Sequence, residues 1–291
     1  MKSYELYQQT VNAALEPALN SLGEIPEKLK EAMLYSLRAG GKRLRPVMLL
    51  AACELAGGSI EAATPFAVGL EMIHTYSLIH DDLPAMDDDD LRRGKPTNHK
   101  VFGEAMAILA GDGLLNGAAE LMAMAACRRE DVRGVRAMTA IMRHAGVTGM
   151  IAGQVMDVTS EGLPPHEALV SYIHSHKTAD LIQAPMEAGL ILAGAEEETV
   201  KHGGAFGYHL GMAFQMTDDL LDVTGDVSLL GKNTGMDQEK NKMTWVALKG
   251  TEKTREDAGR EIQLALDALE RLPGNTEIFR RLAEEILTRK Y

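Results

Sequence analysis

Apolar positions recur along most of the chain at the spacing of one face of an α-helix. In residues 3–22 they include Leu6, Val11 and Leu19, and the same spacing returns in residues 26–39. Because an α-helix turns by about 100° per residue, such positions form an apolar stripe that can pack on a core. Further segments, rich in Ala, Leu and Met, are predicted as helices at 61–82, 104–127, 131–146, 147–160, 165–193, 197–224, 252–272 and 275–289.

The sequence gives no sign of β-sheet or of separate domains. No stretch alternates apolar and polar positions as a half-buried strand does, and no internal repeat or linker divides the chain. Turn residues such as Gly23 and Pro26 separate the helical segments. We therefore predict an all-α fold, with one domain over residues 1–291 and roughly ten or more helices.

Composition narrows the class of protein. Of the 291 residues, 45% are hydrophobic and 25% charged, which is typical of a globular protein in water. The net charge of −12 argues against binding to nucleic acid. The N-terminus lacks an apolar leader, and no run reaches the roughly 18 apolar residues that cross a bilayer. Cys53 and Cys127 are predicted to be buried free thiols, and we expect a cytoplasmic protein.

An acidic stretch is the strongest chemical signal in the sequence. Asp81, Asp82 and the run Asp87–Asp90 place six carboxylates within ten residues, and Arg92 and Arg93 follow. Such crowding is unfavourable unless a cation binds, and a hard divalent ion such as Mg²⁺ suits oxygen ligands. Zinc ligands are missing, and the spacing does not fit an EF-hand. A solvated acidic loop is the alternative.

A second acidic cluster lies far along the chain. On a helix, Asp218 and Asp222 lie within about 40° of each other and Asp219 about 60° beyond Asp222, so the three carboxylates are predicted to share one face. The preceding residues 207–216 are mostly apolar, so this face is expected to turn inward. Buried carboxylates need partners, and two such clusters could clamp metal ions between them.

Several cationic residues could bind anions. Lys42 and Arg45 follow the Gly40-Gly41 pair at a predicted helix start, where a phosphate could bind; a basic helix start facing solvent is equally compatible. His74 falls within about 20° of Asp81 in helical projection, although a lone His on an apolar face is more often a core residue. Lys177 could face a cavity, pair with Asp180 or stay in solvent.

These motifs, in this order, resemble those of the trans-isoprenyl diphosphate synthases over nearly the whole chain. Asp81-Asp82-Leu83-Pro84-Ala85-Met86-Asp87 resembles the family's first DDxxxxD motif, and Asp218-Asp219-Leu220-Leu221-Asp222 resembles the second, preceded by Phe214-Gln215. Gly41-Lys42, Lys177-Thr178 and Gly231-Lys232 fall where the family binds substrate. The resemblance implies the isoprenoid synthase fold, a helical bundle around a central cavity.

The resemblance also implies roles for single residues. The expected metal ligands, for three Mg²⁺ ions with Mn²⁺ as the alternative, are Asp81, Asp82, Asp87, Asp218 and Asp222. The expected contacts of an allylic diphosphate are Arg92, Lys177, Thr178, Gln215, Lys232 and Lys242. The expected contacts of isopentenyl diphosphate are Gly41, Lys42, Arg45, His74 and Arg93. Of these, Asp81, Asp82, Asp87, Arg92, Lys177, Asp218 and Lys232 are expected to act in catalysis.

The implied reaction is ionisation of the allylic substrate, condensation with isopentenyl diphosphate and loss of a proton. Tyr76 and Ser77, five and four residues before Asp81, would form the floor of the product pocket, as in bacterial farnesyl diphosphate synthases that stop at C15. A C20 geranylgeranyl diphosphate synthase, a terpene cyclase, a non-catalytic synthase subunit and a calcium-buffering acidic protein are the alternatives. A homodimer is expected from the family.

Two short segments depart from the family's usual pattern. Ala179-Asp180-Leu181 stands where Gly-Ala-Leu is usual after Lys177-Thr178, which places an extra acid near the allylic site. Met243-Thr244-Trp245-Val246 stands where Thr-Tyr-Pro is common. Both departures bear on substrate preference.

Overall fold

The computed structural model describes residues 2–164, 166–224 and 242–288, and almost all of its regular structure is helical. The α-helices are α1 (Lys2–Asn20), α2 (Glu27–Leu37), α3 (Leu44–Leu55), α4 (Ile60–Asp81), α5 (Asn98–Phe102), α6 (Glu104–Cys127), α7 (Arg133–Ala145), α8 (Met150–Thr159), α9 (Glu167–Ile173), α10 (Asp180–Ala193), α11 (Glu197–Thr224), α14 (Trp245–Leu269) and α15 (Glu277–Thr288). The π-helix η1 (His174–Ala179) joins α9 to α10. The all-α prediction is confirmed.

The structure differs from the predicted elements in three places. Strands β1 (Leu91–Arg92) and β2 (Lys95–Pro96) form a short antiparallel hairpin that the sequence did not suggest. Helix α14 includes a short helical segment, Trp245 to Lys249, that precedes the predicted 252–272, and Gly250, with φ of 76°, breaks the helical geometry between the two parts. The predicted helix 165–193 contains the π-helical turn η1.

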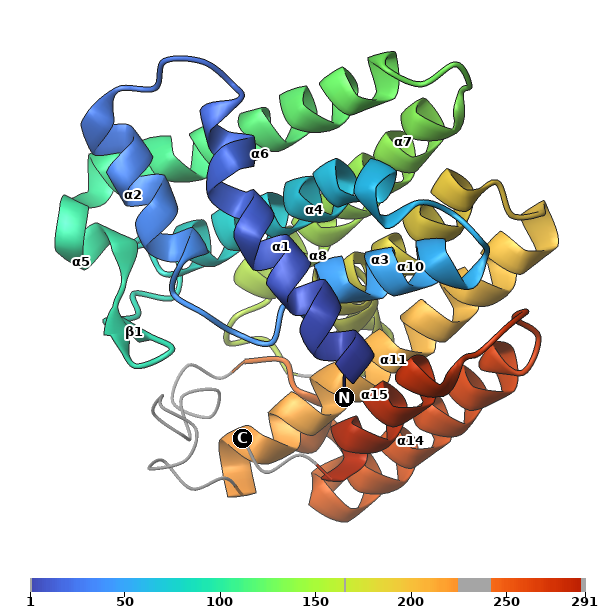
Figure 1. Cartoon of the computed structure of the whole chain (residues 1–291). Helices are drawn as coiled ribbons and strands as arrows, with labels where there is room; N and C mark the ends of the chain where they lie inside the picture. The colour runs from blue at the N-terminus through green and yellow to red at the C-terminus, as the bar shows by residue number, and fades with distance from the viewer. Residues whose placement is uncertain (1, 165, 225–241, 289–291) are drawn as a thin grey trace.

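Helix α4 lies at the middle of the bundle because it is apolar on nearly all sides. It packs against α1, α3, α6 and α10, and Figure 1 shows α1 crossing in front of it. Ser59 caps its N-terminus by accepting a hydrogen bond from the amide of Ala62 at 3.2 Å. The central position of α4 brings its last turn, with Asp81, to the interior of the molecule.

Buried apolar side chains connect the two ends of the described chain. The largest cluster runs from Tyr7 on α1 to Ile286 on α15, and a second cluster surrounds η1 and Trp245. The single domain stays a prediction, which this continuous core supports. Cys53 is buried as predicted, but the prediction was wrong for Cys127, which is exposed because it ends α6 on its outer side.

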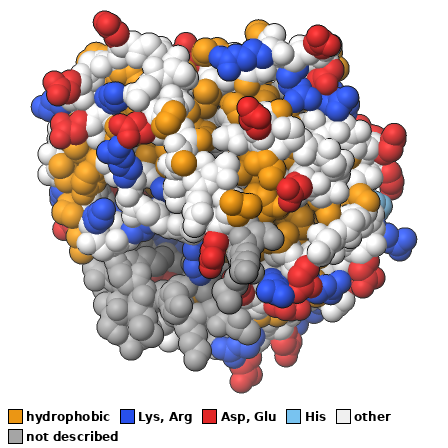
Figure 2. All heavy atoms as spheres, in the orientation of Figure 1, with side chains coloured by type: hydrophobic (Ala, Val, Ile, Leu, Met, Phe, Trp, Pro, Cys, Tyr) orange, Lys and Arg blue, Asp and Glu red, His pale blue; other side chains and the backbone are white. Residues whose placement is uncertain are grey.

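The molecular surface carries mixed charge on the face that Figure 2 shows, where acidic and basic side chains alternate with small apolar patches. Within the described ranges, no helix combines the length and apolar character needed to cross a membrane.

Candidate active site

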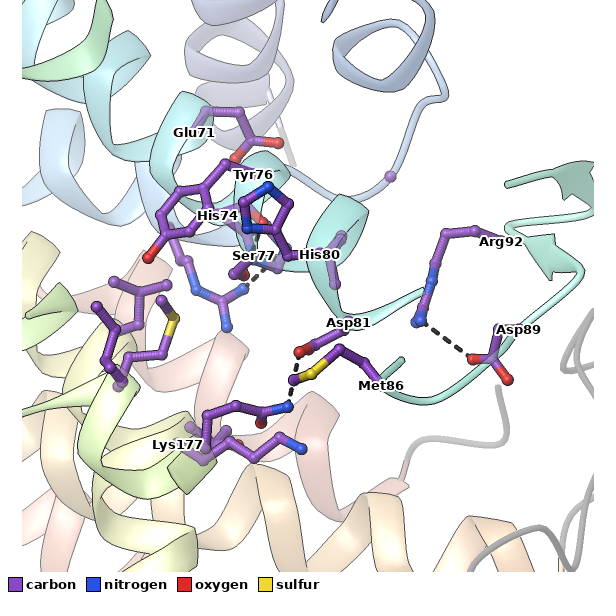
Figure 3. A pocket seen from close by; sticks show the side chains of 18 of the residues that line it. Glu71, His74, Tyr76, Ser77, His80, Asp81, Met86, Asp89, Arg92 and Lys177 are labelled. Atoms are coloured by element: carbon purple, nitrogen blue, oxygen red, sulfur yellow. Dashed lines mark hydrogen bonds and ion pairs between the residues drawn. The ribbon is translucent and has the colours of Figure 1, made fainter. Parts of the chain in front are cut away.

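A large cavity of about 1210 Å³ opens between α3, α4, α6, α8, η1 and α11. Asp81 at the end of α4 and Asp218 on α11 both line it, although 137 positions separate them in the sequence (218 − 81). Figure 3 shows Asp81 between Arg92 on one side and Lys177 on the other. The two acidic segments therefore contribute to one site, as their patterns suggested.

The Asp81 carboxylate lines this cavity and is partly buried. It accepts a hydrogen bond from Nε2 of Gln154, on α8, at 2.9 Å. Burial raises the pKa of Asp81, and the nearby Lys177 ammonium opposes that rise. A desolvated carboxylate that faces open space is suited to receive a cation.

Asp82 turns away from the cavity and holds Arg92. Its side chain is 3% exposed, and its Oδ1 accepts from Nε of Arg92 at 2.9 Å and also from Nη2. The same guanidinium donates to Asp89 at 3.3 Å. Burial raises the pKa of Asp82 to about 6, against the opposing effect of Arg92. Asp82 therefore orients a cavity-lining arginine, in addition to any role as a ligand.

Asp87 and Lys242 join segments that are far apart in the chain. The Lys242 ammonium lies 2.8 Å from Oδ1 of Asp87, and both side chains are partly buried. Lys242 thus reaches the first acidic segment, although the sequence placed it only as a general contact of the allylic substrate. Lys232, the other cation predicted near this place, lies outside the described residues.

The carboxylates of the second acidic segment have different surroundings. Asp218 lines the cavity, whereas Asp219 accepts from Gln215 at 2.9 Å and from the backbone amide of Trp245 at 2.7 Å, with His174 Nε2 at 3.3 Å. The predicted common face is wrong for Asp219, because η1 and the start of α14 pack against its side of α11. Asp222 is buried outside the described lining of the cavity.

A buried basic pair lies at the start of α3. Nη1 of Arg45 is 3.3 Å from Nε2 of His74, and Nε of Arg45 is buried without a hydrogen-bond partner among the described residues. Burial lowers the pKa of Arg45 to about 10, and burial together with Arg45 and Arg93 holds the pKa of His74 well below 6.5. A charged guanidinium beside a neutral imidazole is prepared for an anion.

The loop before α3 is fixed by its neighbours. Gly41 has φ of 111°, and a Cβ there would lie 2.6 Å from the guanidinium of Arg93, so only glycine fits. The hydroxyl of Tyr4 donates to the Lys42 carbonyl at 2.5 Å, and Arg93 donates to the Gly40 carbonyl. These contacts bring Gly41, Lys42 and Arg93 to the cavity that Arg45 and His74 line.

Arg43 differs from its neighbours because its partner is internal. Its guanidinium lies 2.7 Å from Glu71, and both side chains are at most 3% exposed. This buried pair anchors the loop to α4.

The π-helix η1 carries Lys177 and Thr178 to the opposite wall. Nζ of Lys177 lies 2.5 Å from Oδ2 of Asp157, and Thr178 donates to Oε1 of Gln215 at 2.6 Å. Sequence reasoning missed Asp157 and Gln154. Two polar residues three positions apart on the otherwise apolar helix α8 were the signal that could have found them.

The far end of the cavity is apolar. Tyr76 and Ser77 line it from α4, and Tyr76, which is 6% exposed, meets the ring of His80 edge to face at 5.7 Å (Figure 3). Its other lining residues include Leu115, Met150, Ile151, Val158, Leu181 and Phe214. The cavity therefore joins a charged entrance to an apolar interior, which suits a molecule with an anionic head and a hydrocarbon tail.

The donor set of the entrance fits a hard divalent cation. Asp81 and Asp218 offer carboxylate oxygens in a cavity that Arg45, Arg92 and Lys177 also line. In the described part of the chain, no three His, Cys, Asp or Glu side chains converge as a metal site by themselves. A hard cation here would share its coordination shell with oxygens of a ligand or of water.

Comparison with known proteins gives one consistent picture. The sequence model of the polyprenyl synthetase family matches residues 26–284. The farnesyl diphosphate synthase of Geobacillus stearothermophilus is 49% identical over 243 residues, which are 83% of this chain and 81% of that protein. The large subunit 1 of a chloroplastic heterodimeric geranylgeranyl pyrophosphate synthase of Arabidopsis thaliana is 48% identical over 266 residues, 90% of this chain and 71% of that protein.

A solved structure has the same fold. The geranyltransferase of Helicobacter pylori, complexed with magnesium and isoprenyl diphosphate, aligns with a TM-score of 0.82 at 32% identity. The alignment covers 99% of this chain and 97% of that one.

Proposed function

We propose that this chain, which belongs to the polyprenyl synthetase family, is a magnesium-dependent prenyltransferase. The proposed reaction condenses isopentenyl diphosphate with dimethylallyl diphosphate and then with geranyl diphosphate, and its product is farnesyl diphosphate. The observation that carries the proposal is the shared cavity of Asp81 and Asp218, with cations at its entrance and apolar side chains in its depth. The proposed enzyme is cytoplasmic and acts as a homodimer of single-domain chains.

Carboxylates and a diphosphate are both anions, so a divalent cation belongs between them. In the proposal, Asp81, Asp82, Asp87, Asp218 and Asp222 hold Mg²⁺, of which about three ions are expected. When bound by these residues, Mg²⁺ would offset the negative charge that develops on the leaving pyrophosphate. The H. pylori relative, which is complexed with magnesium, supports this assignment.

The cations of the cavity divide between two substrates in the proposal. Arg92 and Lys177 contact the allylic diphosphate, and their charge favours breaking the C–O bond with its electrons leaving on pyrophosphate. Arg45 and the neutral His74 hold the diphosphate of isopentenyl diphosphate, whose double bond attacks the allylic cation. A proton then leaves the new intermediate, and the departing pyrophosphate is the proposed acceptor.

The apolar interior protects the allylic cation from water. The proposed reaction forms no covalent enzyme intermediate, so it needs no nucleophilic side chain. Charged groups stay at the entrance, where the two diphosphates would bind.

Tyr76 is the proposed limit on product length at C15. Its ring is buried on the wall of the cavity one and a half turns before Asp81. A C20 product is the second candidate, because the lining extends to Leu115 and Val158 and the relatives include both farnesyl and geranylgeranyl synthases. Replacement Tyr76→Ala is expected to lengthen the product, measured by chromatography; an unchanged C15 product would contradict this role.

One incubation tests the reaction class. The protein is mixed with Mg²⁺, isopentenyl diphosphate and either dimethylallyl or geranyl diphosphate, and the products are sized with and without a chelator. A C15 prenyl diphosphate that disappears on chelation is expected. Product formation without isopentenyl diphosphate would indicate a terpene cyclase instead, and no product at all would contradict the proposal. Light scattering tests the homodimer.

A further inference from the structure

Four titratable side chains form a cluster next to the π-helix. We call His144, His176, Asp180 and Glu187 the His144 cluster; they come from α7, η1 and α10. None of the four belongs to the described lining of the large cavity. The cluster includes Asp180, the acid that departs from the family's usual pattern and lies three residues after Lys177.

Asp180 bridges two histidines on different elements. Its Oδ1 is 2.7 Å from Nδ1 of His144, and its Oδ2 is 2.7 Å from Nδ1 of His176. The other ring nitrogen of His144 is 3.1 Å from Glu187, which also accepts from Gln183 at 2.6 Å. Asp180 is only 13% exposed, so solvent screens these contacts weakly.

The backbone around η1 is held closely on two sides. A Cβ on Gly153, on α8, would lie 2.1 Å from the backbone nitrogen of Lys177. A Cβ on Gly211, on α11, would lie 2.5 Å from Cα of Ala179. Helices α8 and α11 thus confine the π-helix, and a π-helical turn commonly marks a functional site because it costs regular hydrogen bonding. Neither glycine contact involves α7, so the orientation of the π-helix relative to α7 depends on other residues.

We propose that Asp180 is a positioning residue that ties the π-helical segment to α7 through His176 and His144, and so sets where Lys177 and Thr178 meet the allylic diphosphate. The proposal rests on the proposed function for the identity of the ligand. The attachment itself depends only on the contacts of the His144 cluster.

The charge state of His144 supports this role. Burial alone would lower the pKa of His144, but its hydrogen bonds to Asp180 and Glu187 raise it to about 9. Near neutral pH the ring is therefore an imidazolium that donates from both nitrogens. The carboxylates that face it are Asp180 and Glu187; His176 contacts Asp180 from η1, and Arg143 lies near Glu187.

Replacement His176→Phe tests the attachment without removing the ring. Phenylalanine keeps the contact with Tyr172, whose ring centroid is 4.2 Å away, and loses the nitrogen that faces Asp180. We expect KM for the allylic diphosphate to rise about tenfold, with KM for isopentenyl diphosphate unchanged. Replacement Asp180→Ala, which removes both contacts, should raise the allylic KM further.

His209→Phe is the matched control. His209 also meets a tyrosine ring, Tyr208, edge to face at 5.2 Å and also lies 2.7 Å from a carboxylate, Glu261, but this carboxylate belongs to α14 and not to the His144 cluster. A role limited to stability would change both KM values alike or neither of them. An equal rise in both, or the same allylic shift in His209→Phe, would overturn the proposal.

Hydrogen exchange separates this inference from the proposed function. Peptides that cover residues 174–179 are expected to exchange about tenfold faster in His176→Phe than in the wild type, while peptides of α15 stay unchanged. If the wild type makes no prenyl diphosphate but this local change occurs, the proposed function fails and the attachment stands. Unchanged exchange in 174–179 would overturn the attachment.

Discussion

The two acidic segments are alike in sequence but have different surroundings in the structure. Near the end of α4, the partners are long cationic or amide side chains: Arg92 for Asp82, Lys242 for Asp87 and Gln154 for Asp81. On α11, Asp219 is satisfied by a backbone amide and by the side chains of two packed helices.

The comparison shows that the role of a carboxylate depends on whether its hydrogen-bond donor is a side chain or a backbone amide. A carboxylate held by a long side chain at a cavity can exchange that partner for a bound cation, so its loss should affect catalysis. A carboxylate held by a backbone amide in a packed interior contributes to stability, because its loss leaves buried donors without acceptors. The pair Asp218-Asp219 therefore contains one carboxylate that lines the cavity and one that stabilises the packed interior.

The largest effect is expected from Asp81→Asn, which keeps the shape of the side chain and removes its charge. We expect kcat/KM to fall about 10³-fold, because a neutral amide cannot hold the cation that the diphosphate needs. Steady-state turnover with both substrates and Mg²⁺ measures this.

Stability should not fall in the same variant. Burial already disfavours the charged form of Asp81, so thermal unfolding is expected to stay within a few degrees of the wild type. A large loss of stability with little loss of turnover would reverse the assignment of this segment.

Asp219→Ala should show the opposite balance. The amide of Trp245 and the side chain of Gln215 would lose a buried acceptor, and we expect the free energy of unfolding to drop by about 3 kcal/mol. Urea denaturation, followed by the fluorescence of the single tryptophan, measures it. Equal stability of Asp219→Ala and Asp81→Asn would remove the distinction between the two segments.

Much of the fold follows from the sequence because apolar periodicity is local. The predicted segments 104–127 and 197–224 coincide with α6 and α11, whose apolar residues repeat at helical spacing. The π-turn η1 does not follow, because it depends on close approaches of Gly153 and Gly211 from other helices.

The candidate site was predictable to a similar degree. The aspartate motifs and the Lys42–Arg45 segment could be found because clustered charges are conspicuous, and the structure brings Asp81, Asp218 and Arg45 to one cavity. The orientation of Asp219 was not predictable, since a helical projection gives the angle of a side chain but not which neighbour covers it. Asp157 was missed because its partner is distant in sequence.

A smaller effect is expected from Lys242→Met, which removes the cation that connects the second half of the chain to Asp87. The two side chains are 15% and 20% exposed, so the pair is only partly screened. We expect KM for the allylic diphosphate to rise about tenfold with little change in stability, because the ammonium would contact that substrate in the proposed function.

Lys100→Met is the matched control for this variant. Lys100 lies 2.7 Å from Asp90, in the same acidic stretch, but this pair is exposed and joins residues only ten positions apart in the sequence. KM for the allylic diphosphate is measured for both variants with the same substrates. If both have the same effect, general charge on the acidic stretch matters and the link between the two segments does not.

The smallest expected effect concerns pH and lies outside both acidic segments. Because contacts with Asp180 and Glu187 raise the pKa of His144 to about 9, the folded state binds a proton more tightly than the unfolded chain, whose histidine has a pKa near 6.5. The stabilisation is complete below about pH 6.5 and is lost as pH rises through about 9. Between pH 8 and 9 we expect a loss of about 1 kcal/mol in urea denaturation, and a smaller loss in His144→Gln. Since the slope is compared between two proteins, other titrating groups cancel, and parallel pH profiles would show that His144 does not hold α7 to α10.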